Sequence, residues 1–158
     1  MSIKPIETRY KGYRFRSRLE ARWAVFFDAL RLEWEYEPQG FELPSGAKYL
    51  PDFLIRDRWL AGRTFVEIKR PGSCEEDWAK AKELSAALGV KVLLLTSIDQ
   101  ALRPNTLMLS SDKKWRWYRF DCGTFGVLED RSPLINIDHA VFAARAARFE
   151  HGECGVPA

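Results

Sequence analysis

The sequence predicts one α/β domain with a mixed central sheet flanked by helices. The length of 158 residues corresponds to about one domain. Hydrophobic residues make up 46% of the chain, and 10 Phe, 6 Trp and 5 Tyr supply large side chains for a core. A strand, a helix and a second strand follow one another over residues 64–95, which is the pattern of a right-handed parallel crossover. We therefore predict a single domain over residues 1–151 and a loose tail over residues 152–158.

The first predicted helix covers residues 17–30. Ser17-Arg18-Leu19-Glu20 has the form of a capping box, in which the first and fourth side chains bond to backbone N–H groups at the helix start. Apolar residues then recur at helical spacing, at Trp23, Phe26 and Leu30. Strands are predicted after this helix at residues 33–37, 41–43, 48–55 and 64–69.

The strand over residues 64–69 leads into a second helix. Pro71-Gly72 ends the strand, and Ser73 is the predicted N-cap, with Glu75, Glu76 and Asp77 in the first turn, where the helix dipole favours acids. Gly89 is the predicted C-cap, because glycine readily adopts the left-handed conformation found there. The remaining predicted elements are a buried strand at 90–95, two strands at 106–109 and 115–120, and a helix at 138–149.

Several classes of protein do not fit this composition. The longest strongly apolar run, Val90 to Leu95, is far shorter than the roughly 20 residues of a membrane helix. The first residues lack the apolar stretch of a signal peptide, and three widely spaced cysteines suit a reducing compartment. The sequence has neither a Gly-rich nucleotide-binding fingerprint nor a Cys or His pair with zinc spacing. We expect a cytoplasmic protein with no membrane association.

Charged side chains gather at the ends of two predicted strands. Pro51-Asp52 opens one strand, and Glu67-Ile68-Lys69 closes the next. Because side chains alternate along a strand, Glu67 and Lys69 share a face. Glu20, in the first turn of the first helix, adds a third carboxylate. Carboxylates that converge at one end of a sheet suit Mg²⁺, which binds through a few carboxylates plus substrate phosphate.

Pro51-Asp52, Glu67-Ile68-Lys69 and the upstream helical Glu20 together resemble the signature of the PD-(D/E)XK nuclease superfamily. The predicted order of helix, three strands, helix and strand is similar to the αβββαβ core of that family over residues 9–96. The resemblance implies a restriction-endonuclease-like fold, to which this chain adds a C-terminal strand pair and helix. It also implies a divalent-metal-dependent DNA endonuclease, similar to small phage enzymes and to junction resolvases that act on branched DNA.

The resemblance also implies roles for individual residues. Asp52 and Glu67 would bind Mg²⁺, which Mn²⁺ would replace, with help from the backbone carbonyl of Ile68. Glu20 would complete the metal site, and Lys69 would be the catalytic lysine. Each residue also has a structural explanation: Glu20 completes the capping box, Asp52 starts a turn, and Glu67 and Lys69 form a surface ion pair. The alternative function is accordingly an inactive nuclease-like fold that binds nucleic acid or another protein.

Basic residues are concentrated near the start of the chain. Residues 1–22 hold seven Lys and Arg against two acids, whereas the net charge of the whole chain is only +3. Tyr10 to Arg16 interleaves aromatic and basic side chains, a pattern that grips phosphates while rings stack on bases. The alternative is a strand or loop whose aromatic residues enter the core. The predicted DNA-binding residues are Arg9, Lys11, Arg14, Arg16 and Arg18.

The resemblance also bears on assembly and location. Junction resolvases need two active sites, so a homodimer is compatible with it. A candidate interface is the apolar third helix, with Ala140, Val141, Phe142 and Ala144. The expected location is the cytoplasm of a bacterium or of a phage-infected host.

Overall fold

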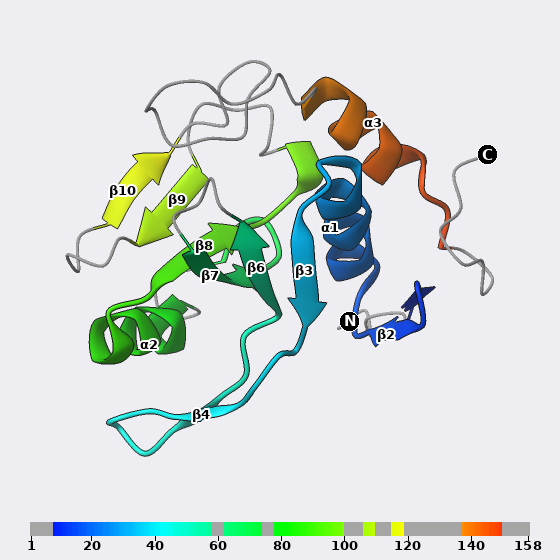
Figure 1. The fold of residues 1–158 in the computed structure, drawn as a ribbon. Helices are drawn as coiled ribbons and strands as arrows, with labels where there is room; N and C mark the ends of the chain where they lie inside the picture. Colours follow the sequence, from blue (N-terminus) through cyan, green and yellow to red (C-terminus); the bar gives the residue numbers. More distant parts are fainter. Residues whose placement is uncertain are drawn as a thin grey trace.

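The computed structural model describes residues 8–57, 62–73, 78–99, 106–109, 115–118 and 137–149. Its central element is a six-stranded sheet with the strand order β10-β9-β8-β7-β6-β3 (Figure 1). β7 and β8 run parallel, and the other neighbouring strands of this sheet are antiparallel. The sheet is therefore mixed, as predicted. Its strands are β3 (Glu33–Tyr36), β6 (Phe53–Asp57), β7 (Gly62–Ile68), β8 (Lys91–Leu95), β9 (Thr106–Leu109) and β10 (Trp115–Tyr118).

Helices cover both faces of this sheet (Figure 1). α1 (Arg18–Ala29) and α3 (Ile137–Ala146) pack on one face, and α2 (Ala79–Leu88) packs on the other. The chain order α1, β3, β6, β7, α2, β8 confirms the predicted αβββαβ core, and β9, β10 and α3 follow it as the predicted strand pair and helix. Two short hairpins lie outside the six-stranded sheet: β1 (Thr8–Tyr10) with β2 (Tyr13–Phe15), and β4 (Phe41–Glu42) with β5 (Lys48–Tyr49).

Alternate residues of β7 enter two different cores. Val66 and Ile68 belong to the buried cluster that α1 and α3 cover, whereas Phe65 belongs to the cluster beneath α2. This is the alternation on which the predicted shared face of Glu67 and Lys69 depends, since successive side chains of a strand point to opposite sides. Glu67 lies two residues after Phe65, so its side chain points to the same side of the sheet, the side that α2 covers. The largest buried side chain of the first cluster is Trp23, which anchors α1 to the sheet.

The N-terminus of α1 has the predicted cap. The hydroxyl of Ser17 accepts a hydrogen bond from the backbone N–H of Glu20 at 3.2 Å. The same hydroxyl donates to Oε1 of Glu20 at 2.7 Å. A capping oxygen of this kind satisfies one of the backbone donors that a helix start leaves unpaired. The cap therefore fixes both the first turn of α1 and the side chain of Glu20.

The strand predicted over residues 48–55 is wrong, because the structure divides it into two. β5 ends at Tyr49 and pairs with β4, whereas β6 begins at Phe53 and pairs with β3 and β7. Pro51 lies between them, and a proline has no N–H to donate to a sheet ladder. Asp52 therefore precedes its strand instead of lying within it.

The predicted start of the second helix is also wrong. The hydroxyl of Ser73 donates to the carbonyl of Arg70 at 2.7 Å, within the turn that follows β7. α2 begins at Ala79 with Trp78 at the N-cap, and its first turn contains no acidic residue. Gly89 is the C-cap with a φ of 65°, as predicted. The predicted first-turn acids, Glu75, Glu76 and Asp77, lie outside the described residues.

The apolar residues of α3 are largely used inside the chain. Ala140, Val141 and Ala144 are buried in the cluster that contains α1. These three therefore do not form the exposed interface that the sequence suggested, and of the four only Phe142 is exposed, at 70%. A homodimer stays a prediction. No helix among the described residues is long and apolar enough to cross a membrane. The predicted tail, residues 152–158, lies outside the described residues.

Candidate active site

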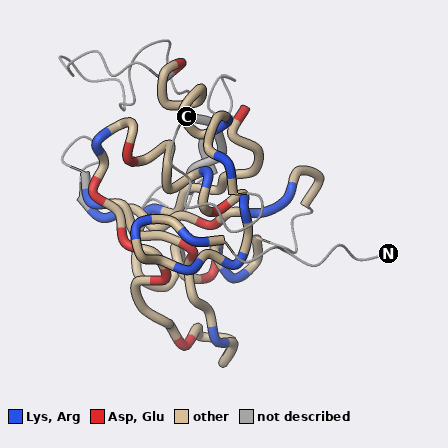
Figure 2. Tube along the Cα trace, turned by 90° about the vertical axis from the view of Figure 1, so that its right-hand side faces the viewer, with Lys and Arg blue, Asp and Glu red and all other residues tan. Residues whose placement is uncertain are grey.

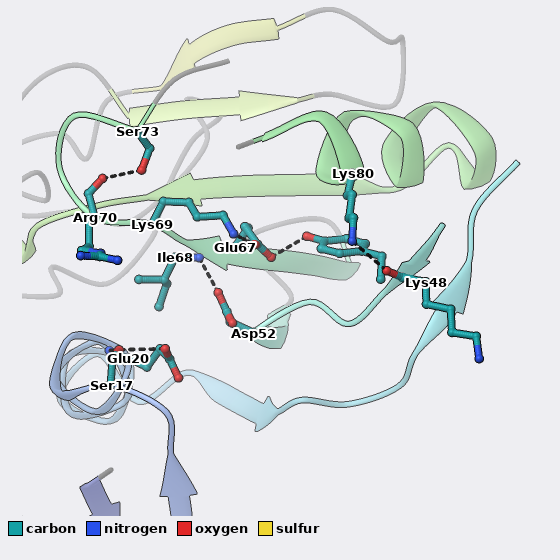
Figure 3. Close-up of polar contacts among 11 residues, drawn as sticks. Ser17, Glu20, Lys48, Asp52, Glu67, Ile68, Lys69, Arg70, Ser73 and Lys80 are labelled. Carbon is teal, nitrogen blue, oxygen red and sulfur yellow. Dashed lines mark hydrogen bonds and ion pairs between the residues drawn. The ribbon is translucent and has the colours of Figure 1, made fainter. Parts of the chain in front are cut away.

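Asp52 and Glu67 meet at the end of the sheet where β7 ends (Figure 3). The antiparallel register pairs Phe53 with Val66, so Asp52, one residue before Phe53, comes opposite Glu67. Oδ2 of Asp52 accepts a hydrogen bond from the backbone N–H of Ile68 at 2.6 Å. This bond ties the segment before β6 to the end of β7 and points the Asp52 carboxylate at the Glu67-Ile68-Lys69 motif.

Glu67 is 5% exposed, and both of its carboxylate oxygens have a partner. Oε1 forms an ion pair with Nζ of Lys69 at 2.7 Å. Oε2 accepts a hydrogen bond from the hydroxyl of Tyr49 at 2.6 Å. Glu67 and Lys69 thus share a face, as predicted, and form the ion pair that the structural explanation requires. A buried glutamate, however, differs from one in a surface ion pair, because its charge is expensive without compensation.

The electrostatic environment of Asp52 is unfavourable for a second negative charge. Burial and the neighbouring Glu67 carboxylate raise the pKa of Asp52 to about 8, and Glu20 adds to this effect. The N–H of Ile68 and the ammonium of Lys69 act in the opposite direction and lower the pKa of Asp52. Two close carboxylates with one ammonium leave an excess of negative charge, so the pair favours the uptake of a proton or a cation.

Glu20 is buried near this pair but has its own partners. Its Oε2 accepts hydrogen bonds from the hydroxyl of Tyr36 at 2.7 Å and from the backbone N–H of Arg16 at 3.1 Å. Glu20 comes from α1, on the face of the sheet opposite Glu67. Its charge nevertheless contributes to the raised pKa of Asp52. Within the described part of the chain, no three His, Cys, Asp or Glu side chains are grouped closely enough to hold a metal ion. The structure therefore brings Asp52, Glu67 and Lys69 together and leaves Glu20 bound to its cap.

The predicted DNA-binding residues have different surroundings on the β1–β2 hairpin and α1. Lys11 forms an ion pair with Asp28 at 2.8 Å, and Arg16 forms one with Glu37. Arg9 and Arg14 are exposed and lie opposite each other in the hairpin. Arg18 is the first residue of α1. Figure 2 shows this side of the molecule, where basic and acidic positions are interleaved.

The aromatic residues of the hairpin are largely used by the core. Phe15 is fully buried and packs against Tyr36 with ring centroids 4.4 Å apart. The hydroxyl of Tyr10 donates to Asp28 at 2.7 Å. Tyr13 is 38% exposed and packs against Trp34 with ring centroids 5.2 Å apart. The alternative of aromatics that enter the core is thus correct for Phe15, whereas Tyr13 stays partly exposed beside the basic residues.

Tyr49 is the residue that the sequence interpretation missed. In one strand over residues 48–55, Tyr49 and Asp52 would point to opposite faces, because three residues separate them. The interruption at Pro51 allows both side chains to approach Glu67. Burial and the Glu67 carboxylate raise the pKa of the Tyr49 hydroxyl far above its usual value, so the hydroxyl stays protonated and donates. Proline inside a predicted strand was the available signal.

Solved structures that resemble this chain include two proteins, one of them in complex with DNA. No family model and no curated protein matches the sequence. One structure, from Anabaena variabilis, is described as "a putative nuclease belonging to DUF820"; it has a TM-score of 0.48 and 10% identity over 91% of this chain and 93% of that one. The other is the DrdV–DNA complex, with a TM-score of 0.32 and 14% identity over 56% of this chain and 8% of that one. Both TM-scores are below 0.5, so the function proposed below rests on the residues of this chain.

Proposed function

We propose that the chain is a divalent-metal-dependent DNA endonuclease of the PD-(D/E)XK type. The observation that carries the proposal is the convergence of Asp52, Glu67 and Lys69 at one end of the sheet. Asp52 and Glu67 come from neighbouring strand ends, and the Lys69 ammonium lies 2.7 Å from Glu67. Three charged groups with these elements and this spacing are the arrangement that the sequence resemblance implies.

The chemistry of the donor set fits Mg²⁺, with Mn²⁺ as its substitute. Mg²⁺ binds oxygen ligands, commonly one or two carboxylates together with water and substrate phosphate. Asp52 and Glu67 are the carboxylates that would hold it, the Ile68 carbonyl would contribute, and Glu20 would complete the site. The raised pKa of Asp52 is consistent with this assignment, because burial and then the neighbouring Glu67 carboxylate raise it, and a bound cation would neutralise that neighbouring charge.

Each residue would have a distinct part in cleavage. When bound, a divalent cation polarises the phosphodiester and lowers the pKa of the attacking water. Lys69 would stabilise the charge that grows on the phosphate in the transition state, since it is cationic and shares a face with Glu67. The exposed arginines of the β1–β2 hairpin, Arg9 and Arg14, would contact the DNA backbone.

The deciding experiment measures cleavage of a panel of DNA substrates. The purified protein is incubated with supercoiled plasmid, linear duplex, single strand and a four-way junction, in Mg²⁺, Mn²⁺ or a chelator. We expect cleavage that depends on the cation and is lost in Asp52→Asn and Glu67→Gln. A preference for the junction would show the structure selectivity that the resemblance to resolvases suggests.

Glu35→Gln is the matched control for Glu67→Gln. Glu35 is also a strand glutamate in an ion pair, with Arg56 at 2.7 Å, but it lies on β3 and its side chain is 38% exposed. This variant should cut at the wild-type rate. A folded Glu67→Gln protein that also cuts at the wild-type rate would contradict the proposed metal site.

The second candidate function is a non-catalytic nucleic-acid-binding or protein-interaction module on the same fold. It is favoured by the partners of Glu20, which bind this carboxylate to the α1 cap, and by the ion pair that occupies Glu67. The same substrate panel separates the two candidates: a module of this kind would bind DNA or a protein but would leave every substrate intact in Mg²⁺ and in Mn²⁺.

A further inference from the structure

Tyr49 lies against the candidate metal site without being one of its predicted members. Its hydroxyl donates to Oε2 of Glu67 at 2.6 Å, while the Lys69 ammonium binds Oε1. We infer that Tyr49 is a positioning residue, which holds the Glu67 carboxylate in the orientation that binds the divalent cation. This inference rests on the proposed function, and it assigns to the β4–β5 hairpin a part in that function.

The packing of Tyr49 makes it suited to hold another side chain in place. Tyr49 is 7% exposed and belongs to the buried cluster that includes Phe65 and Leu84. Its ring is therefore confined from the sheet side and from the α2 side. A hydroxyl on a ring that is packed in this way has a restricted position, and a carboxylate bonded to it gives up little additional entropy when a ligand binds.

The backbone that leads into Tyr49 is also anchored. Nζ of Lys80, on α2, donates to the carbonyl of Lys48 at 3.1 Å (Figure 3). At the turn of the hairpin, Ser45 donates its N–H and its hydroxyl to the carboxylate of Glu83 at 2.5 and 2.8 Å. Two residues of α2 thus secure β5 and its turn, and the position of Tyr49 depends on α2 as well as on the sheet.

The two partners of Glu67 act differently because one is neutral and one is charged. The Tyr49 hydroxyl orients the carboxylate without cancelling its charge, so Glu67 keeps its attraction for a cation. The Lys69 ammonium, by contrast, is a cation on Oε1 and is itself 34% exposed. Oε1 is therefore the atom at which a divalent cation competes with Lys69, and Oε2 is the atom that Tyr49 keeps in place.

The test compares Tyr49→Phe with the wild type by calorimetric titration of the metal-free protein with Mn²⁺, without DNA. Phe keeps the ring and removes only the hydroxyl. We expect the Mn²⁺ dissociation constant to rise about 10- to 100-fold, the usual loss when a group that orients a metal ligand is removed. With DNA, the Mg²⁺ concentration for half-maximal cleavage should rise, and the rate at saturating Mg²⁺ should approach that of the wild type.

Tyr10→Phe is the matched control. The Tyr10 hydroxyl also donates to a carboxylate, that of Asp28, at 2.7 Å, but in the hairpin against α1. Its removal deletes the same kind of bond and should leave the Mn²⁺ affinity unchanged. If Tyr49 acts in folding alone, Tyr49→Phe should lose thermal stability but keep the Mn²⁺ affinity of the wild type. That result would overturn the inference.

The failure of this inference differs from the failure of the proposed function. If the wild type binds Mn²⁺ through Glu67, as the loss in Glu67→Gln would show, and Tyr49→Phe binds it equally well, only the role of Tyr49 is wrong. If the folded wild type binds no Mn²⁺ and cuts no substrate, the proposed function is wrong and the role of Tyr49 falls with it.

Discussion

At the scale of single residues, each charge at the end of β7 is stabilised by a different kind of partner. Asp52 accepts a backbone N–H, Glu67 accepts a tyrosine hydroxyl, and Lys69 pairs with Glu67. Of these contacts, only the ion pair between Lys69 and Glu67 brings opposite charges together. Uncompensated charge in a buried place is costly, so the two carboxylates are held by the fold against an unfavourable free energy. Such costs are commonly found where a protein binds a ligand.

Lys69 should act in the chemical step and not in binding of the metal. We expect Lys69→Met to lower the cleavage rate about 100- to 1,000-fold, the loss typical of removing one group that stabilises charge in the transition state. DNA affinity measured in Ca²⁺ should change only modestly. Because the ammonium pairs with Oε1 of Glu67, its removal should leave Mn²⁺ affinity equal or higher. Lys69→Arg should restore little activity, since the planar guanidinium is larger than an ammonium.

Parallel loss of metal affinity, DNA affinity and rate in Lys69→Met would instead make this lysine a binding residue. The three measurements use the same protein preparation, with circular dichroism to show that the variant is folded. This comparison separates a role in the transition state from a role in the ground state, because only the first leaves both affinities in place.

The raised pKa of Asp52 predicts how stability depends on pH in chelator. The ordinary pKa of the group is 3.8, and in the folded protein it is about 8. Between about pH 4 and pH 8 the folded protein therefore keeps a proton that the unfolded chain has released. The unfolded state then binds fewer protons, so the free energy of unfolding falls as the pH rises through this range.

Chemical unfolding at several pH values checks this prediction. The wild type should lose stability from pH 5 to pH 8, and Asp52→Asn should lose less over the same interval, because its side chain does not titrate. Mn²⁺ should restore stability to the wild type at pH 8, since ligands that bind only the folded state stabilise it. Equal slopes for the two proteins in chelator would show that Asp52 is not the group responsible.

At the scale of elements, the predictions that succeeded depend on local signals. The α1 cap is encoded within four residues, Ser17 to Glu20, and the left-handed cap of α2 is encoded by Gly89 alone. The faces of β7 follow from alternation within one strand. These features could be predicted because the residues that determine them are neighbours in the sequence.

The boundaries that failed depend on distant partners. Only residues 50–52 separate β5 from β6 in the sequence, but β5 pairs with β4 and β6 pairs with β3 and β7. Alternation along residues 48–55 carries no information about which strand each half will join. The contact of Tyr49 with Glu67 could not be predicted for the same reason, because it depends on how the hairpin packs against α2. The Glu67-Ile68-Lys69 motif of the site could be recognised within the sequence, whereas the approach of Tyr49 depends on packing between distant segments.

The α1 cap gives a prediction at this scale. Ser17→Ala removes the acceptor of the Glu20 N–H and the donor to the Glu20 carboxylate. We expect a loss of about 0.5–2 kcal/mol in the free energy of unfolding, which is the usual effect of removing a serine cap. Urea denaturation measures it. Ser73→Ala, in the turn that follows β7, is the comparison, and a loss no larger than that of Ser73→Ala would mean that the cap does not stabilise the fold.

At the scale of the whole molecule, the basic start of the chain is partly neutralised by folding. The sequence gathers seven Lys and Arg in residues 1–22. In the structure, two acidic residues from later in the chain form ion pairs with this region. Asp28 of α1 pairs with Lys11, and Glu37, which follows β3, pairs with Arg16. Net charge along the sequence therefore overestimates the field that an approaching polyanion meets. Arg9 and Arg14 form an exposed cross-strand pair on the hairpin, and this places two cations side by side as candidates for phosphate contacts.

The salt dependence of DNA binding tests this view, with a second arginine pair as the control. We expect Arg9→Gln/Arg14→Gln to weaken binding similarly for all duplex sequences. The slope of log affinity against log salt concentration should fall by about 0.9 for each lost phosphate contact. Arg56 and Arg63 also lie opposite each other, on β6 and β7, at the end of β7 away from Glu67. Arg56→Gln/Arg63→Gln removes the same charge and should leave the slope unchanged, because position and not net charge determines which phosphates are contacted. Equal slopes for both double variants and a common loss of affinity would show that DNA binding depends only on overall charge.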